Sequence, residues 1–182
     1  MTPAEREHTK RSVGQEASSE ATLISKPFPE LSVGEKGVSN GRTLTETDVV
    51  NFCMLTGNWL ELHANREFAK HTLYGQRLVQ GSLVFSVGNA MLPFDPGVVE
   101  AFYGVDRLRF LRPTFINDTI HAEAEITALR EKGDRHGIAT LDLQVVNQRD
   151  ETVMRCNFSL LIRKQRLRAG PAETSGTEGT RT

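Results

Sequence analysis

The sequence predicts a single α+β domain, in which helices cover one face of an antiparallel sheet. Helical patterns are confined to the first half of the chain, where the last of them is almost entirely apolar, and the second half alternates apolar and polar residues. A length of 182 residues suits one such domain better than two.

The first predicted element is an extended segment with turns, because residues 31–44 contain several glycines. A helix should begin after Thr45, whose hydroxyl can cap it. Asp48 stands three residues later, so the pair resembles a capping box. Gly57 follows the apolar pattern of this helix, and glycine is the usual residue just beyond a helix end.

Two more helices are expected before the strands. Asn65 can cap a short second helix. A third runs from Gly81 to about Pro93, and we expect it to be buried on most sides. Its apolar residues recur at helical spacing: Leu83, Val84, Val87, Ala90 and Met91.

The rest of the chain has the pattern of strands. Three segments alternate apolar and polar side chains, so that each has one buried face: residues 120–128, 139–145 and 154–162. Residues 99–111 predict a further strand, broken at Gly104, and hairpin turns are expected at residues 132–134 and 149–150. Together they predict an antiparallel meander of about four strands, with Ala128 on its buried face.

Two tails should flank the folded unit. Residues 1–28 and 166–182 are predicted to be disordered, and the domain is expected to span residues 29–165. Both tails are polar with few large apolar side chains, so they cannot bury enough surface to offset the entropy lost on ordering.

The composition argues against several classes of protein. Lys and Arg number 22 against 23 Asp and Glu, so no positive excess indicates nucleic acid or an anionic membrane as a partner. No apolar run is long enough to cross a bilayer, and residues 1–20 lack the apolar segment of a secretory signal. Cys53 and Cys156 fall on apolar faces without metal-ligand spacing, so we interpret them as reduced core thiols of a cytoplasmic protein.

Three stretches carry a resemblance to a known family. They are Thr56-Gly57-Asn58-Trp59-Leu60-Glu61-Leu62-His63, Tyr74-Gly75-Gln76-Arg77-Leu78-Val79-Gln80-Gly81 and Arg109-Phe110-Leu111-Arg112-Pro113-Thr114-Phe115-Ile116-Asn117-Asp118-Thr119. In motif and order they resemble the MaoC-like family of (R)-specific enoyl-CoA hydratases and 3-hydroxyacyl-thioester dehydratases. The resemblance covers roughly residues 31–163 and implies the hotdog fold, an antiparallel curved sheet wrapped around a long central helix.

The resemblance also implies a catalytic site. Hydration of a 2-enoyl thioester needs a base for water, an acid for the α-carbon and a donor for the developing enolate oxygen. In the family an Asp and a His five residues later share the proton transfers, and the glycine that opens the central helix supplies the N–H donor. By motif position His63 matches that His and Gly81 matches that glycine. Asn58 stands where the family has the Asp, and Gln80 where it often has a His.

Three interpretations remain open, because an amide can orient water but cannot deprotonate it at neutral pH. In the leading one the protein is a hydro-lyase with His63 as its acid and base, and either Asn58 positions the water or Glu61 supplies a carboxylate. The simpler interpretation of Glu61 is an exposed residue of a non-helical segment. In the second, the pocket serves isomerisation, cyclisation or elimination on an acyl or polyketide-like substrate. In the third, the chain is a non-catalytic acyl-binding subunit of a hotdog heterodimer.

Four further residues are candidates for substrate binding. Trp59 and Tyr74 either line an acyl tunnel or pack as ordinary loop aromatics. Ser86 and Asn89 either face the pocket from the central helix or bond to local backbone. Three arginines are interpreted as a solvated strand face: Arg107, Arg109 and Arg112.

The expected partners follow from the same resemblance. The substrate would be a thioester of coenzyme A or of acyl carrier protein. A short curved sheet leaves an edge strand that pairing would cover, so we expect a homodimer, with a second hotdog subunit as the alternative. No metal or redox cofactor is expected, because the sequence contains neither a metal-ligand cluster nor a phosphate loop.

Overall fold

The computed structural model describes residues 23–167. Three short elements come first: the 3-10 helix η1 (Phe28–Glu30), β1 (Lys36–Val38) and β2 (Arg42–Thr43). Helices follow: α1 (Glu46–Thr56), α2 (Glu61–Ala64), α3 (Arg66–Lys70) and α4 (Gly81–Ala90). Long strands complete the order: β3 (Val99–Phe110), β4 (Thr119–Lys132), β5 (His136–Asn147) and β6 (Thr152–Arg163). None of the helices in this part of the chain is long and apolar enough to cross a membrane.

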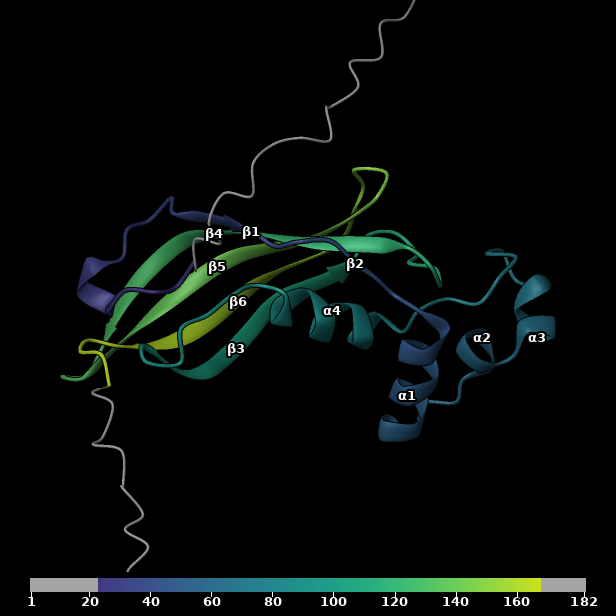
Figure 1. The fold of residues 1–182 in the computed structure, drawn as a ribbon, viewed down its shortest axis with the longest axis horizontal. Helices are drawn as coiled ribbons and strands as arrows, with labels where there is room; N and C mark the ends of the chain where they lie inside the picture. The colour runs from purple at the N-terminus through teal and green to yellow at the C-terminus, as the bar shows by residue number, and fades with distance from the viewer. Residues whose placement is uncertain (1–22, 168–182) are drawn as a thin grey trace, which may run out of the picture.

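The described strands form one six-stranded antiparallel sheet in the order β1-β4-β5-β6-β3, with β2 also beside β4. Hairpins join β4 to β5 and β5 to β6, as predicted. β3 pairs with β6 rather than with β4, so the predicted four-strand meander is wrong at this strand. The sheet curves over α4 (Figure 1), which is the arrangement of the hotdog fold.

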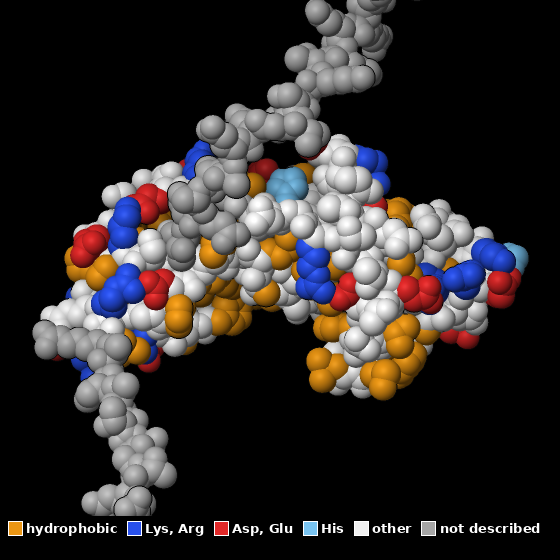
Figure 2. Space-filling view, viewed as in Figure 1, with side chains coloured by type: hydrophobic (Ala, Val, Ile, Leu, Met, Phe, Trp, Pro, Cys, Tyr) orange, Lys and Arg blue, Asp and Glu red, His pale blue; other side chains and the backbone are white. Residues whose placement is uncertain are grey.

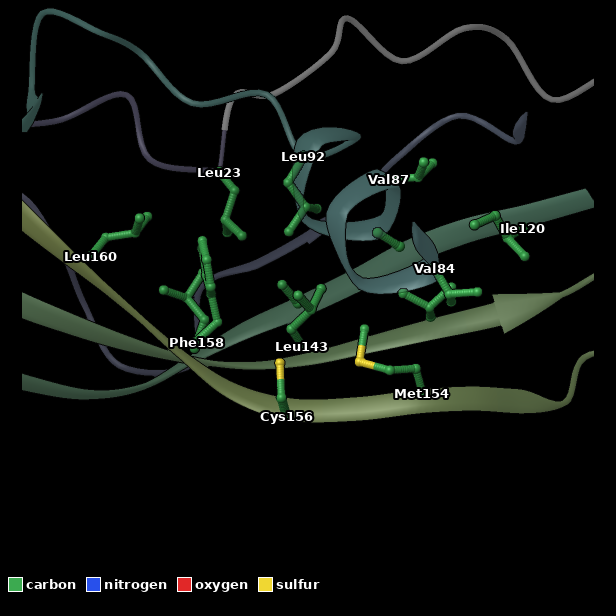
Figure 3. Packing of buried hydrophobic residues seen from close by; sticks show 14 of the residues in the cluster. Leu23, Val84, Val87, Leu92, Ile120, Leu143, Met154, Cys156, Phe158 and Leu160 are labelled. Atoms are coloured by element: carbon green, nitrogen blue, oxygen red, sulfur yellow. The ribbon is translucent and has the colours of Figure 1, made fainter. Parts of the chain in front are cut away.

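The helix α4 lies against the concave face of the sheet. Its buried residues face the strands: Leu83, Val84, Val87 and Gly88. The helix approaches β5 so closely that a Cβ atom on Gly88 would lie 2.3 Å from Cγ2 of Val145. Figure 3 shows Val84 above Met154 of β6 in this interface. Residues on the opposite side of α4 are exposed, so the expectation of burial on most sides is wrong for that face: Ser82, Ser86 and Ala90.

The predicted alternation is confirmed on β5 and β6. Their inward residues are all buried: Ala139, Leu141, Leu143, Val145, Met154, Cys156, Phe158, Leu160 and Ile162. On β4 the alternation holds as far as Ile126, where the pairing with β5 shifts register. A bulge exchanges the two faces of a strand, so Ala128 is exposed and Leu129 packs against the core. The predicted burial of Ala128 is therefore wrong.

The helix α1 begins and ends as predicted. The Thr45 hydroxyl accepts a hydrogen bond from the Asp48 N–H at 3.3 Å, and the Asp48 carboxylate accepts one from the Thr45 N–H at 2.8 Å. Gly57 ends the helix in the left-handed region, with φ 71°. Asn65 caps α3 through its side-chain oxygen. The helices α1, α2 and α3 project beyond the end of the sheet (Figure 1), and we call residues 46–70 the helical arm.

The folded unit begins before the predicted boundary at residue 29. Three apolar residues of the predicted tail are buried: Leu23, Ile24 and Phe28. Phe28 packs so close to β5 that a Cβ atom on Gly137 would lie 2.3 Å from its ring. A few apolar side chains therefore anchor a segment whose composition is otherwise polar, which corrects the N-terminal boundary.

The C-terminal boundary moves as well. The backbone N–H of Leu167 donates to the carbonyl of Gly97 at 2.9 Å, and Arg166 is ion-paired with Asp95. The folded unit therefore reaches at least residue 167. The rest of the predicted tails, residues 1–22 and 168–182, lies outside the described residues.

Both cysteines are free and buried, as predicted, Cys53 in α1 and Cys156 in β6. Burial raises the pKa of the Cys156 thiol to about 11. This side chain is therefore protonated at neutral pH and belongs to the core rather than to a reactive site.

Candidate functional site

A cavity of about 290 Å³ opens where the helical arm meets the sheet. Its walls come from α2, from the segment before α4, from α4 itself and from the end of β3 with the residues after it. Its lining includes His63, Tyr74, Leu78, Gly81, Phe110, Arg112 and Thr114. The cavity thus brings together two of the three residues predicted to be catalytic, His63 and Gly81, and does not include the third, Asn58.

The backbone holds His63 in one orientation. In α2 its N–H donates to the carbonyl of Leu60 at 2.8 Å, and its side chain is buried. Its Nδ1 lies 2.9 Å from the carbonyl oxygen of Leu78. A carbonyl oxygen can only accept, so Nδ1 carries the hydrogen and the neutral ring presents an unprotonated Nε2. Within the described chain nothing hydrogen-bonds to Nε2, so its lone pair is available to a ligand in the cavity.

Gly81 opens α4, where backbone N–H groups have no partner inside the helix. The helix dipole adds partial positive charge at this end. A Cβ atom on Gly81 would lie 2.7 Å from the ring of Phe110, so a larger residue here would require that ring to move. The start of α4 therefore suits a ligand in the cavity whose carbonyl oxygen gains negative charge, because the free N–H groups and the helix dipole stabilise that charge.

Gln80 contacts α1 and does not line the cavity. Its side chain is 1% exposed, and its Nε2 donates to Sγ of Cys53 at 3.0 Å. Its Oε1 has no hydrogen-bond partner among the described residues. Gln80 therefore ties the start of α4 to the helical arm instead of contributing a group to the cavity.

Among the aromatic and amide residues predicted near His63, Tyr74 lines the cavity and the others do not. Asn58 is half-buried just after α1, and its backbone N–H donates to the Thr56 hydroxyl at 3.3 Å. Trp59 is 53% exposed. In this structure neither the Asn58 nor the Trp59 side chain reaches the cavity wall.

Ser86 and Asn89 bond to the backbone of their own helix. The Ser86 hydroxyl donates to the carbonyl of Ser82 at 2.8 Å, and the Asn89 amide donates to the carbonyl of Phe85 at 3.2 Å. Neither residue lines the cavity. The structure therefore agrees with the interpretation that Ser86 and Asn89 bond to local backbone.

Glu61 lies in a helix, so the expectation of a non-helical segment is wrong. It is the first residue of α2. Residues two apart in a helix are separated by about 200° around the axis, so Glu61 and His63 point in different directions. Glu61 is exposed and does not line the cavity, which leaves His63 without a carboxylate from this position.

One of the three arginines assigned to a solvated strand face lies at the cavity. Arg107 and Arg109 are exposed, as expected. Arg112 lines the cavity, and its NH1 lies 3.6 Å from the Glu151 carboxylate, which comes from the β5–β6 hairpin. Partners so far apart in the sequence leave no local pattern, so sequence reasoning missed this contact.

The contacts of Glu151 should make stability sensitive to acid. Hydrogen bonds from Asn147 and Arg149 lower the pKa of the Glu151 carboxyl. Such a group stabilises the fold above its ordinary pKa, and this contribution is lost as the pH falls through the lowered value. We expect Glu151→Gln to lower the free energy of unfolding at neutral pH, and its difference from wild type to shrink below about pH 4. Urea unfolding at both pH values measures this, and a difference independent of pH would contradict it.

Comparison with known proteins identifies the family of this domain. The family model described as MaoC like domain matches residues 30–147. The chain belongs to the MaoC-like family. The (R)-specific enoyl-CoA hydratase of Aeromonas caviae is 33% identical over 119 residues, which cover 65% of this chain and 85% of that protein. Protein MaoC of Klebsiella aerogenes is 39% identical over 97 residues, which cover 52% of this chain and 29% of that protein.

A solved structure agrees with the MaoC-like assignment. The monoamine oxidase regulatory protein from Archaeoglobus fulgius superposes with a TM-score of 0.74 at 39% identity, covering 79% of this chain and 98% of that one. The MaoC-like match includes every cavity residue named above. The cavity therefore lies in the part of the chain that defines the family.

Proposed function

We propose that this protein adds water to 2-enoyl thioesters, or removes it from 3-hydroxyacyl thioesters, with His63 as acid and base. One observation carries the proposal: Nδ1 of His63 donates to the Leu78 carbonyl, which leaves Nε2 without a hydrogen on a side chain that lines the same cavity as Gly81. The hydratase named among the relatives supports the reaction class.

A single histidine can perform both proton transfers. In hydration, Nε2 of His63 takes a proton from water while the water oxygen bonds to C3 of the thioester. The electron pair of the C2–C3 double bond moves toward the carbonyl oxygen, which the N–H of Gly81 stabilises. The imidazolium then gives the proton to C2, so that H and OH have been added and the ring is neutral again. Dehydration follows the reverse sequence.

Asn58 takes no proton in this mechanism. By resemblance we assign it the orientation of the water, a role that an amide can fill without accepting a proton. A missing general base costs about 10²- to 10⁴-fold in rate. We therefore expect turnover well below that of a site that has both carboxylate and imidazole.

The test is turnover of crotonyl-CoA and longer 2-enoyl-CoAs, followed by loss of the conjugated enoyl absorbance. Slow hydration that depends on the enzyme and increases with its concentration is the expected result. Lack of turnover of every thioester at micromolar enzyme would overturn the proposal. Binding of the thioester without turnover would then favour an acyl-binding subunit, and formation of a different product would favour a redirected pocket.

We also propose that two copies pair through β3. β3 is the last strand of the sheet and pairs only with β6 among the described strands, so one edge of its backbone is free. Large apolar residues on and just after it are exposed: Phe102, Tyr103, Val105, Phe110 and Leu111. Met54 and Leu55 of α1 are exposed as well, and Figure 2 shows apolar side chains on the projecting arm and on the underside of the sheet, on either side of a hollow.

A lysine on the β3 edge should separate the copies. Val105→Lys places a charge where a second strand would pair, which is how natural edge strands avoid association. Val38→Lys is the matched control, because Val38 is 67% exposed on β1 at the opposite edge of the sheet. Light scattering should give twice the chain mass for wild type and Val38→Lys, and the single mass for Val105→Lys. A wild-type monomer at micromolar concentration would contradict the homodimer and leave the edge to a different hotdog subunit.

We place this activity in the cytoplasm. Its substrate would be a thioester of coenzyme A or of acyl carrier protein. The two free thiols support the location, because a reducing compartment keeps cysteines unpaired.

A further inference from the structure

We propose that Asp118 is a positioning residue that sets the tautomer of His63 through Phe115 and Leu78. The inference deepens the proposed function, because it concerns the same Nε2. Asp118 does not line the cavity, and it acts through contacts that begin in the β5–β6 hairpin and end at the imidazole.

The contact nearest the imidazole is the Leu78 carbonyl, whose position decides which ring nitrogen carries the hydrogen. Leu78 belongs to no helix or regular strand. Its N–H donates to the carbonyl of Leu62 at 3.1 Å, and an isolated antiparallel bridge joins it to Phe115. Beside that bridge the Val79 N–H donates to the carbonyl of Thr114 at 2.9 Å. The acceptor of His63 is therefore held in place by residues 114–115.

The second contact is a turn that fixes Phe115. The Phe115 N–H donates to Oδ2 of Asp118 at 2.8 Å, and the Asp118 N–H donates back to the Phe115 carbonyl at 3.0 Å. Asn117 closes the turn with φ 76°, in the left-handed region that asparagine tolerates better than most residues. Its N–H donates to the carbonyl of Leu44 at 2.7 Å. The Leu44 N–H donates in return to the carbonyl of Asp118 at 2.9 Å, so the backbone next to β2 holds one side of the turn. On the side of Phe115, the Asp118 carboxylate supplies the side-chain support.

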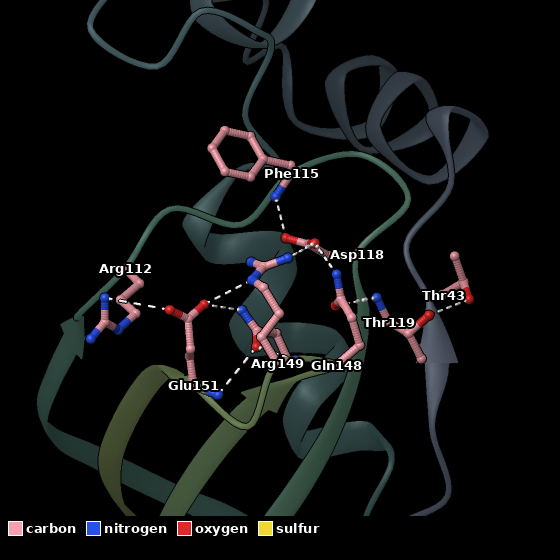
Figure 4. Close-up of polar contacts among 9 residues, drawn as sticks. Thr43, Arg112, Phe115, Asp118, Thr119, Gln148, Arg149 and Glu151 are labelled. Atoms are coloured by element: carbon pink, nitrogen blue, oxygen red, sulfur yellow. Dashed lines mark hydrogen bonds and ion pairs between the residues drawn. The ribbon is translucent and has the colours of Figure 1, made fainter. Parts of the chain in front are cut away.

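The third contact anchors that carboxylate. The side chain of Asp118 is 6% exposed, and its Oδ1 accepts hydrogen bonds from Nε2 of Gln148 at 2.6 Å and NH1 of Arg149 at 3.1 Å. Arg149 is itself fixed by Glu151, through Nε to Oε2 at 2.9 Å. Figure 4 shows Phe115, Asp118 and this cluster in one continuous network. Charge-assisted hydrogen bonds to a buried carboxylate are stronger than neutral ones, so the hairpin is a firm anchor.

Arg112 connects the same hairpin cluster to the wall of the cavity. It precedes the turn, lines the cavity and pairs with Glu151. The wall of the cavity and the acceptor of His63 are thus held by one cluster. Without Asp118 the turn and Leu78 lose their shared support, and the imidazole is free to take the tautomer whose Nε2 carries hydrogen and cannot accept a proton.

The experiment reads the tautomer directly. Nitrogen-15 NMR of the full chain, at a pH where the imidazole is neutral, distinguishes protonated Nδ1 from protonated Nε2, and His63→Gln assigns the signals by their loss. We expect the Nδ1–H form in wild type and a mixture in Asp118→Ala. In the latter, kcat should fall by roughly tenfold or more while KM changes by less than about twofold, because the base is misplaced rather than the substrate site removed. Asp118→Asn keeps an acceptor for the Phe115 N–H and should recover most of the tautomer and of kcat.

A matched pair of arginine variants distinguishes a specific effect on His63 from a general loss of stability. Arg149→Met removes one donor to Asp118, and Arg155→Met removes an arginine of similar exposure that pairs with Asp142 elsewhere on the sheet. Arg149→Met should shift the tautomer and lower kcat, and Arg155→Met should do neither. Unchanged tautomers in Arg149→Met and in folded Asp118→Ala would overturn the inference even if the wild type is active. If the tautomer shifts in Asp118→Ala and Arg149→Met but the wild type turns over no thioester, the proposed reaction is overturned and the positioning role is supported.

Discussion

Replacing His63 with alanine is expected to lower kcat/KM for a 2-enoyl-CoA by about 10²- to 10⁴-fold, the range that a positioned acid or base contributes. Both proton transfers of the proposed mechanism pass through its Nε2. The carboxylates of Glu61 and Glu151 do not line the cavity and cannot replace the imidazole. The rate of loss of enoyl absorbance, measured at several enzyme concentrations, gives the ratio.

Two variants separate chemistry from structure in this prediction. His63→Gln can still donate to the Leu78 carbonyl but has no group that exchanges protons near neutral pH, so it should lose the same activity with an unchanged unfolding midpoint. His71→Ala changes an exposed histidine just after α3 and should keep the wild-type rate. Near wild-type turnover by His63→Ala would remove this residue from the mechanism.

Restoring a carboxylate with Asn58→Asp is expected to raise kcat by about 10²-fold, the lower end of a general base's contribution. The two other parts of the site are in place: an imidazole held in the Nδ1–H form and a helix N-terminus at Gly81. An aspartate five residues before His63 would take the proton from water and leave the imidazole to protonate C2. The same crotonyl-CoA assay, with kcat and KM determined separately, measures the gain.

Asn51→Asp is the control for this gain, because it adds the same charge to an exposed position of the same arm. It should leave kcat unchanged. A rise in both variants would indicate a general electrostatic effect. No rise in Asn58→Asp would mean that the Asn58 side chain stays outside the cavity during catalysis, and would favour a pocket rebuilt for another reaction.

The parts of the fold that the sequence predicts are those determined by near neighbours. Thr45 and Asp48 cap α1 within a single turn, and the faces of β5 and β6 follow from alternation alone. The position of β3 beside β6 does not follow from alternation, because alternation identifies a strand but not the strand that it pairs with. The shift after Ile126 and the buried Phe28 likewise depend on contacts between distant segments.

The candidate site, like the fold, could be predicted from the sequence only in part. Motif positions led to His63 and Gly81, and the structure brings both to one cavity. The orientation of His63 could not be predicted, since it depends on the Leu78 carbonyl, an atom that every residue has. Asp118 was visible only as part of a family motif, and Arg112 was interpreted as part of a solvated strand face. Their partners, Arg149 and Glu151, lie far along the chain in the β5–β6 hairpin.

The free edge of β3 sets a condition on every kinetic measurement of this protein. If two copies cover each other there, dilution separates them by mass action and exposes the apolar residues beside the cavity mouth, Phe110 and Leu111. Specific activity would then rise with enzyme concentration until pairing is complete. A rate measured at a single low enzyme concentration would describe a mixture of assembly states rather than the chemistry of His63.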